Sequence, residues 1–190
     1  MTLPYDFLFP AMWFGYLGYW GAMSAKVTDS VRSEPASSRM TRLVLMICAF
    51  ALLWLPRTFV PVLDRRFLPS GGWCFWSGAA VTAAGLLFSV WARNHLGRNW
   101  SQAVTVKDGH KLITSGPYAA VRHPIYTGLL LAFLGTAIAR AEWRGLLALL
   151  LVFVAIRAKM KLEEQWMRAQ FGESYESYSR RVAALVPYIF

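Results

Sequence analysis

Side chains of the kinds that bind small charged molecules gather in two separated stretches of the chain: Arg122, His123, Pro124 and Tyr126 in the first, and Lys159, Glu163 and Glu164 in the second. A proline directly after His123 suits the first turn of a helix, and a helix N-terminus favours an anionic group such as a carboxylate. A carboxylate such as Glu163, on a neighbouring helix, could reach a bound cation. The two stretches therefore predict a site at the membrane boundary, where Glu163 could reach a bound cation.

Each of these residues also has a simpler interpretation when it is taken alone. Arg122 and His123 by themselves fit better as anchors of a helix at lipid headgroups, and Tyr126 fits an interfacial aromatic. Lys159 and Glu163 would look the same on a solvated, salt-bridged helix. The three histidines of the chain lack the helical pairing of a haem or metal site, so we expect no metal.

The composition indicates a membrane protein. Of the 190 residues, 56% are hydrophobic and 16% are charged, which is more apolar surface than a soluble domain of this size can bury. The net charge of +10 is spread between the apolar runs, as expected for contact with lipid headgroups and not for nucleic-acid binding. Cys48 and Cys74 lie within or beside apolar runs, and we expect both thiols to be buried.

The chain predicts an all-α integral membrane protein with about five transmembrane helices, over 7–23, 43–63, 73–91, 124–139 and 145–156. The second helix should kink or stop near Leu55, because Pro56 follows. The fourth and fifth form a helical hairpin, and the fifth continues as a helix past Arg157 until Gly172. Residues 24–42 read as a polar loop.

Two regions follow: 1–92, with three transmembrane helices and the polar loop, and 93–190, with a cofactor loop, the hairpin and C-terminal helices. The same assignment of spans places fifteen Lys and Arg residues on one side of the membrane and five on the other. Because positive residues concentrate on the cytoplasmic side, the N-terminus should lie outside. The C-terminal helices should then form a cytoplasmic cap that carries the site.

Three blocks of sequence together resemble the isoprenylcysteine carboxyl methyltransferase family. They are Leu112-Ile113-x-Ser115-Gly116-Pro117-Tyr118, Arg122-His123-Pro124-x-Tyr126-x-Gly128, and Glu163-Glu164 followed by Phe171-Gly172 and two tyrosines. The combination is far more specific than its parts, and the resemblance covers roughly residues 90 to 190. It implies an integral membrane enzyme that takes a methyl group from S-adenosylmethionine, with the cofactor held by the C-terminal helices and loops.

Carried over position by position, the resemblance assigns the cofactor pocket. It implies that the cofactor is bound by His110, Lys111, Leu112, Ile113, Tyr118, His123, Pro124, Ile125, Tyr126 and Glu163, and that Lys159, Glu163 and Glu164 form the catalytic set. The chemistry agrees, since an ammonium, a carboxylate and a sulfonium call for a carboxylate, a helix N-terminus and aromatic faces. Lys159 stands where eukaryotic members have an arginine associated with the substrate carboxylate, so the acceptor stays open.

The expected partners are membrane lipids and a lipophilic small molecule or lipidated acceptor, such as an isoprenylcysteine-like carboxylate, with no nucleic acid. One alternative is a NADPH-dependent sterol or enone reductase of the membrane, because such reductases resemble this family around Arg122-His123-Pro124. A second alternative is a non-catalytic scaffold that binds anionic lipid. Binding of S-adenosylhomocysteine or NADPH separates these hypotheses.

Overall fold

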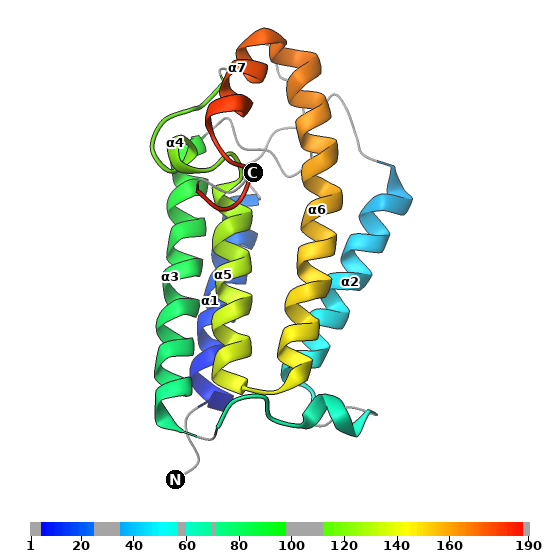
Figure 1. Cartoon of the computed structure of the whole chain (residues 1–190), viewed down its shortest axis with the longest axis vertical. Helices are drawn as coiled ribbons and strands as arrows, with labels where there is room; N and C mark the ends of the chain where they lie inside the picture. Colours follow the sequence, from blue (N-terminus) through cyan, green and yellow to red (C-terminus); the bar gives the residue numbers. More distant parts are fainter. Residues whose placement is uncertain (1–4, 25–34, 57–59, 70, 98–111, 188–190) are drawn as a thin grey trace.

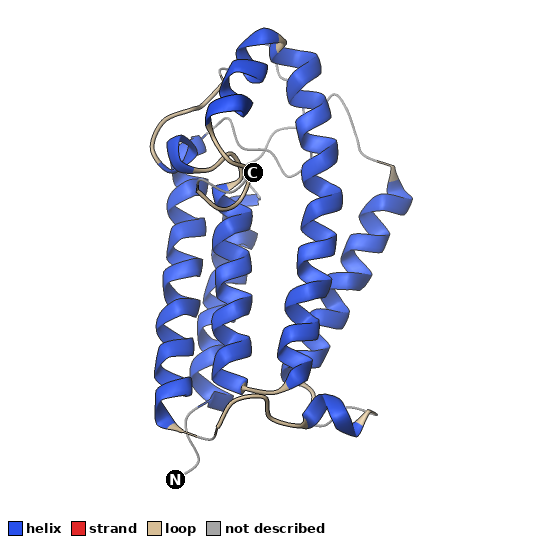
Figure 2. Ribbon diagram, viewed as in Figure 1, coloured by secondary structure: helices blue, strands red, loops and turns tan. Residues whose placement is uncertain are grey.

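The computed structural model describes residues 5–24, 35–56, 60–69, 71–97 and 112–187. Its elements are α1 (Tyr5–Ser24), α2 (Ala36–Trp54), the 3-10 helix η1 (Pro61–Asp64), α3 (Gly72–Leu96), α4 (Pro117–Ala120), α5 (Pro124–Arg140), α6 (Trp143–Phe171) and α7 (Glu173–Arg181). The long helices α1, α2, α3, α5 and α6 run lengthwise through the molecule (Figure 1). The described residues contain helices and loops but no strand (Figure 2).

Helices α3 and α5 approach each other more closely than ordinary side chains allow. A Cβ atom added at Gly128 would lie 2.5 Å from the carbonyl oxygen of Gly85, and one added at Gly135 would lie 2.6 Å from that of Gly78. Small residues permit this contact in a membrane, where close packing replaces hydrophobic burial as the force between helices. The two helices therefore form a rigid pair, and α5 carries half of the site at its N-terminus.

Polar side chains buried among these helices have partners. The hydroxyl of Thr82 donates to the carbonyl of Gly78 at 2.8 Å, and the indole of Trp13 donates to the hydroxyl of Thr136 at 3.2 Å. The hydroxyls of Tyr16 and Ser89 lie 2.8 Å apart. Since an unpaired polar group is costly away from water, these bonds fix α1 against α3 and α5.

The predicted hairpin of the last two long helices is present. Helix α5 ends at Ala141, which has a φ of 57°, and α6 begins at Trp143. Arg144 is buried beside this turn, where it pairs with Glu142 at 2.5 Å and donates to the carbonyl of Leu55 at 2.6 Å. The hairpin turn is therefore fixed to the end of α2, so that α2 and α6 lie side by side (Figure 1).

Several predicted boundaries need correction. Residues 36–42 are helical and belong to α2, so the polar loop expected over 24–42 ends before Ala36. Helix α3 continues past the expected boundary at residue 92 to Gly97, whose positive φ of 52° ends it. Cys74 is buried as expected, but Cys48 is exposed on the outer face of α2. The stop near Leu55 and the continuation of α6 to Gly172 are confirmed.

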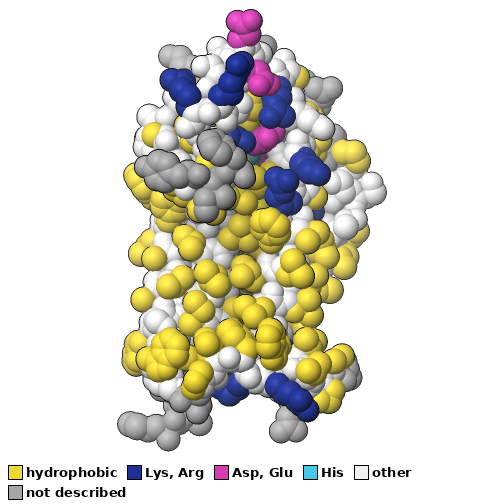
Figure 3. Space-filling view, viewed as in Figure 1, with side chains coloured by type: hydrophobic (Ala, Val, Ile, Leu, Met, Phe, Trp, Pro, Cys, Tyr) yellow, Lys and Arg dark blue, Asp and Glu magenta, His cyan; other side chains and the backbone are white. Residues whose placement is uncertain are grey.

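On the face shown in Figure 3, a broad apolar belt lies between two charged ends. Within the described residues, Ala36–Trp54 and Gly72–Leu96 are long and apolar enough to cross a membrane, and Pro124–Arg140 is a shorter apolar helix. Large apolar side chains such as Phe14, Ile47 and Leu87 are exposed on the outside of the bundle. Such a surface is expected against lipid.

Candidate functional site

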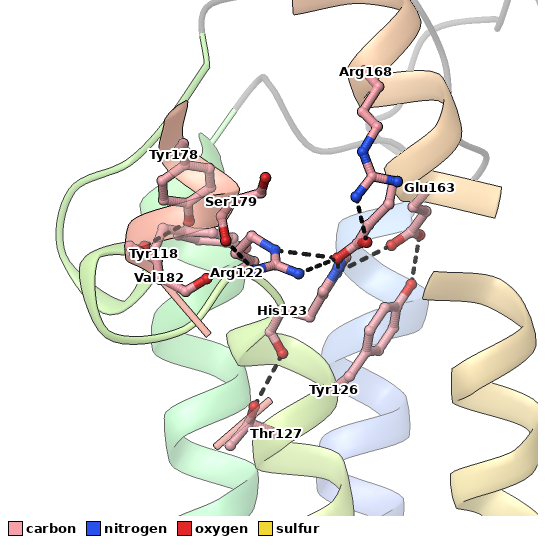
Figure 4. A network of polar contacts seen from close by, with 11 residues as sticks. Tyr118, Arg122, His123, Tyr126, Thr127, Glu163, Arg168, Tyr178, Ser179 and Val182 are labelled. Atoms are coloured by element: carbon pink, nitrogen blue, oxygen red, sulfur yellow. Dashed lines mark hydrogen bonds and ion pairs between the residues drawn. The ribbon is translucent and has the colours of Figure 1, made fainter. Parts of the chain in front are cut away.

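The two predicted stretches meet at the end of the bundle that carries α7 (Figure 4). Pro124 occupies the first turn of α5, and His123 precedes it as the N-cap residue. The long α6 extends past the apolar belt and brings Glu163 and Glu164 beside His123. Because α6 is one unbroken helix from Trp143 to Phe171, the hairpin turn at the far end sets the position of these carboxylates.

Glu164 is surrounded by three cationic side chains. Its carboxylate lies 2.8 Å from Nη2 of Arg122, 3.3 Å from Nε2 of His123 and 3.5 Å from Nη2 of Arg168. The hydrogen bond from His123 lowers the pKa of Glu164 most; burial opposes it, Arg122 adds to it, and the result is a pKa of about 2. Glu164 is therefore ionised at neutral pH and holds three segments of the chain together.

Glu163 has a different set of partners. Its carboxylate accepts a hydrogen bond of 2.5 Å from the hydroxyl of Tyr126 and lies 3.5 Å from Nδ1 of His123 and 3.7 Å from Nζ of Lys159. Burial favours the protonated acid, but His123 and Lys159 outweigh it, so the pKa of Glu163 is lowered. An ionised, largely buried carboxylate is thus available at the centre of the site.

The imidazole of His123 bridges the two carboxylates through both of its nitrogens. Burial by itself lowers the pKa of His123, but the hydrogen bonds to Glu163 and Glu164 raise it by more, and the net direction is upward. An imidazolium can donate from both nitrogens at once, as this geometry requires. The ring also stacks on Tyr126, with centroids 5.6 Å apart.

The C-terminal segment is docked onto the start of α5. Nη1 of Arg122 donates to the carbonyls of Ser179, at 2.9 Å, and Val182. The backbone N–H of Arg122 donates to Ala183 at 2.8 Å, and the hydroxyl of Thr127 donates to Leu185 at 2.7 Å. These bonds hold the segment after α7 against the N-terminus of α5.

Tyr118 lies buried at the edge of the site, on the short helix α4. Gly116, with a φ of 59°, makes the turn that starts this helix, and a Cβ there would lie 2.7 Å from the ring of His95. Tyr178 of α7 donates to the carbonyl of Tyr118 at 2.6 Å. Burial, and next the charge of Glu163, raise the pKa of the Tyr118 phenol well above its usual value. Tyr118 therefore stays neutral and presents an aromatic face.

The structure brings together most of the predicted site. His123, Tyr126, Lys159, Glu163 and Glu164 contact one another directly. Pro124 is buried and Ile125 is partly buried in the first turn of α5, and Leu112 and Ile113 are partly buried on the approach to α4. His110 and Lys111 lie outside the described residues.

Sequence reasoning did not find how Arg122 is used or that Arg42 lies near the site. Arg122 joins Glu164 to backbone carbonyls of the C-terminal segment. Arg42 of α2 interacts electrostatically with Tyr126. The run Arg122-His123-Pro124 drew attention to the position of Arg122. Its carbonyl partners could not be predicted, because every residue has a backbone carbonyl whatever its side chain. Arg42 fell in the segment that was expected to be a loop.

The arrangement has the parts needed to hold a zwitterionic ligand with an extra positive charge. Glu163 offers a carboxylate, and the rings of Tyr118 and Tyr126 offer faces for a cation. Among the described residues, no side chain caps the N–H groups in the first turn of α5, which leaves these donors for an anionic group.

The comparisons with known proteins agree with one another. The family model described as phospholipid methyltransferase matches residues 73–174. A probable protein-S-isoprenylcysteine O-methyltransferase of Oryza sativa subsp. indica is 34% identical over 96 residues, which are 49% of this chain and 50% of the relative. The chain thus spans about half the length of that relative. Methanethiol S-methyltransferase 2 of Bradyrhizobium diazoefficiens is 42% identical over 74 residues, 38% of this chain and 27% of the relative.

A solved structure shows a similar fold. The eukaryotic intramembrane Ras methyltransferase ICMT, an isoprenylcysteine carboxyl methyltransferase, aligns with a TM-score of 0.59 at 23% identity, covering 84% of this chain and 55% of the other. At this identity the match concerns the fold alone. With the sequence matches, it confirms the resemblance predicted from the three blocks of sequence.

Proposed function

Because this chain belongs to the phospholipid methyltransferase family, we propose that it is a membrane-embedded methyltransferase that uses S-adenosylmethionine and acts on a lipophilic acceptor. The observation that carries the proposal is the convergence of His123, Tyr126 and Glu163 at the N-terminus of α5. The match over 73–174 includes all three residues.

The residues present fit the cofactor. We assign its ammonium to Glu163 and its carboxylate to the free N–H groups of Ile125 and Tyr126 in the first turn of α5. Tyr118 and Tyr126 would lie against its cationic and adenosine parts, and Leu112 and Ile113 would line it along the loop. His110 and Lys111 remain assigned to this pocket by the family resemblance.

S-adenosylmethionine supplies a methyl group that is already activated by a sulfonium. When bound, the cofactor would give this methyl group to a lone pair of the acceptor, and its sulfur would keep the electron pair of the carbon–sulfur bond. The protein must hold the acceptor in line with the methyl group and exclude water. These two effects should supply most of the rate enhancement. We assign this task to Tyr126, Lys159 and Glu163. Glu164 is a positioning residue, because its contacts go to Arg122, His123 and Arg168.

The proposed topology has five transmembrane helices, with the N-terminus outside and the site on the cytoplasmic side. The charged extension of α6 and α7 lie together at one end, beyond the apolar belt (Figure 3). The start of α5 lies at the same end, so the site would stand at the membrane boundary. An acceptor with an apolar tail could then reach the site from the bilayer.

Methyl transfer is favoured over the reductase alternative. The relatives named above are described as methyltransferases that act on oxygen or sulfur. This agrees with the acidic residues on α6, because Glu163 suits the cationic end of S-adenosylmethionine, whereas NADPH carries phosphates that a buried carboxylate would repel. The two groups of relatives differ in the acceptor atom, which is oxygen in one group and sulfur in the other.

The test is methyl transfer from radiolabelled S-adenosylmethionine to membrane extracts by the purified chain. We expect label in the lipid fraction with the wild-type protein and at least about a hundredfold less with His123→Ala or Glu163→Ala, as for loss of positioning groups. Glu173→Ala, a change at an exposed carboxylate outside the network, serves as the matched control. Full activity of Glu163→Ala would contradict the proposal.

A further inference from the structure

An apolar groove lies at the end of the molecule opposite to the candidate site. It is formed where η1 packs against the first two turns of α6, beside the hairpin turn and away from α7 (Figure 1). Its volume is about 370 Å³. The residues that line it are all apolar, and they are Val62, Leu63, Trp143, Leu146, Leu147 and Leu150. Pockets for small ligands have volumes of ~300–1,000 Å³, so the groove is large enough to hold part of an apolar ligand.

The walls of the groove are fixed by contacts between η1, the residues after it and the start of α6. The backbone N–H of Trp143 donates to the carbonyl of Arg65 at 3.1 Å. The rings of Phe67 and Trp143 lie against each other, with centroids 5.6 Å apart. Arg144 is buried, and its Nε lies 3.4 Å from the carboxylate of Asp64. The groove is therefore preformed, and a ligand would not have to order its walls on binding.

The groove is open to the outside of the bundle, where lipid is expected. Val62, Trp143 and Leu150 line it and are 53%, 49% and 55% exposed. A tryptophan such as Trp143 is typical of the boundary between hydrocarbon and headgroups. From Trp143 to Leu150, α6 rises by roughly 10 Å, so a chain in the groove would run from headgroup level into the hydrocarbon. An acyl chain of a lipid fits this direction and this polarity.

An exposed cation stands at the Trp143 end of the groove. Arg65 directly follows η1 and is exposed. Its guanidinium takes part in no ion pair within the described ranges, because the two carboxylates of η1 and the hairpin turn are held by the arginines of that turn. Arg66 is also exposed, but its Nε donates to the carbonyl of Leu68 at 3.3 Å. A phosphate at the end of a chain in the groove would therefore meet the charge of Arg65.

We propose that this groove binds one acyl chain of an anionic membrane phospholipid, with Arg65 as the ligand of its phosphate. The apolar lining accounts for the chain, and a guanidinium can hold two phosphate oxygens at once. The positive charge at this end favours a headgroup without a compensating amine, such as phosphatidylglycerol, over phosphatidylcholine. The lipid site lies at the other end of α6 from His123 and Glu163, so the inference does not depend on the proposed function.

The test uses Trp143 as a reporter, because bromine in a lipid chain quenches tryptophan fluorescence on contact. The purified full chain is reconstituted into phosphatidylcholine vesicles with a rising fraction of phosphatidylglycerol or phosphatidylcholine that is brominated near the ester end of one acyl chain. The quenching measured in Trp143→Phe is subtracted, which isolates the signal of Trp143 from those of the other tryptophans. Half-maximal quenching should need about fivefold less phosphatidylglycerol than phosphatidylcholine, as for one arginine–phosphate contact at a membrane surface. Equal fractions of the two lipids would overturn the proposal.

Matched variants locate the headgroup. Arg65→Gln should abolish the preference for phosphatidylglycerol, whereas Arg66→Gln, which removes the same charge one residue further along the chain, should keep it. Arg65 contacts Trp143 through its backbone carbonyl, which glutamine also provides, so Arg65→Gln should keep the wild-type Tm. A preference that survives in Arg65→Gln would overturn the proposal. An equal loss in both variants would also overturn it, because the lipid would then respond to surface charge in general.

A second pair of variants locates the acyl chain, and it decides the matter if Arg65→Gln does not fold. Leu150→Gln places an amide in the groove and should raise the fraction of phosphatidylglycerol needed to quench Trp143 about fivefold, as for a polar group set against an apolar chain. Leu87→Gln, at an exposed apolar position on α3, should leave that fraction unchanged. Quenching that ignores Leu150→Gln would overturn the proposal, because Trp143 would then sense bulk lipid alone. An absence of quenching by either lipid would also overturn it, since another copy of the chain would then cover the groove.

Discussion

The hydroxyl of Tyr126 donates a hydrogen bond of 2.5 Å to Glu163 across 37 positions of sequence. This bond joins the first turn of α5 to the part of α6 that extends beyond the apolar belt. Glu163 is thereby oriented by a ring that also stacks on His123 and lies beneath Lys159. The site is thus built across the two arms of the helical hairpin, and its geometry depends on how those arms are held.

Removal of this phenolic hydroxyl should disturb the carboxylate and leave the fold intact. In Tyr126→Phe, the ring remains but Glu163 loses a donor, so its orientation loosens. We expect the Kd for S-adenosylhomocysteine, measured by isothermal titration calorimetry, to weaken about five- to tenfold. Tyr19→Phe removes a comparable bond, from Tyr19 to Asn94 at 2.6 Å, and should leave that Kd unchanged. An unchanged Kd in Tyr126→Phe would show that the bond does not orient Glu163.

Arg122 should matter for the docking of the C-terminal segment. Arg122→Met leaves Glu164 with two cationic partners and removes the donors to the carbonyls of Ser179 and Val182. We expect a loss of about 2 kcal/mol in stability and faster hydrogen exchange over residues 179–185. In Arg181→Met, where an exposed arginine donates only to the carbonyl of Ser177, protection should persist. Protection that survives in Arg122→Met would argue against this docking role.

Stability should depend on pH through His123. Its folded pKa is raised above the ordinary 6.5, so its stabilising contribution is complete below about pH 6.5 and is lost as the pH rises through the folded value. Glu164 behaves oppositely: with a folded pKa of about 2, its contribution is present above about pH 4.5 and is lost only in acid. The Tm of the wild type should therefore fall above pH 6.5.

The variant His123→Gln should lack this alkaline decline, because no group in its place titrates there. Melting curves from pH 6 to 9 check the difference, with His95→Gln as a control that should follow the wild type. Parallel profiles for His123→Gln and the wild type would mean that another group causes the decline.

Close packing of α3 and α5 should be sensitive to a single methyl group. Gly128→Ala would place a Cβ 2.5 Å from the carbonyl of Gly85 and 2.7 Å from the backbone N of Ser89, so the helices must separate. We expect a destabilisation of about 2 kcal/mol and weaker cofactor-product binding, because α5 carries His123. Gly18→Ala on α1 meets nothing within 4 Å and should be neutral. Equal Tm values for the two variants would count against the tight pair.

Much of this architecture is predictable because apolar length and helix signals are local. The hairpin, the end of α2 before Pro56 and the stop of α6 at Gly172 all follow from proline, glycine or charge at one position. The start of α2 was missed, because Ser37, Ser38 and Arg39 suggest a loop when they are read without α6. Bonds one turn apart, from Thr41 to the carbonyl of Ser37 and from Arg42 to the hydroxyl of Ser38, support a helix that local composition disfavours.

The parts of the site that depend on side-chain type were predictable from the sequence. Tyr126 and Glu163 were identified from the combined blocks of sequence, and the structure joins them. The division of work between Glu163 and Glu164 could not be foreseen, since it depends on which way two adjacent residues of one helix point. Glu164 faces Arg122, and Glu163 faces Tyr126. The position of Arg42 near Tyr126 depends on helix packing, so it could not be predicted from the sequence either.

The most direct test of the central claim is the binding of S-adenosylhomocysteine and NADPH to the purified chain by isothermal titration calorimetry. We predict saturable binding of S-adenosylhomocysteine, at least about tenfold weaker binding in Glu163→Gln, unchanged binding in the exposed control Glu173→Gln, and no binding of NADPH. Binding of NADPH in place of S-adenosylhomocysteine, or binding of S-adenosylhomocysteine to Glu163→Gln with wild-type affinity, would contradict a methyl-transfer site built around Glu163.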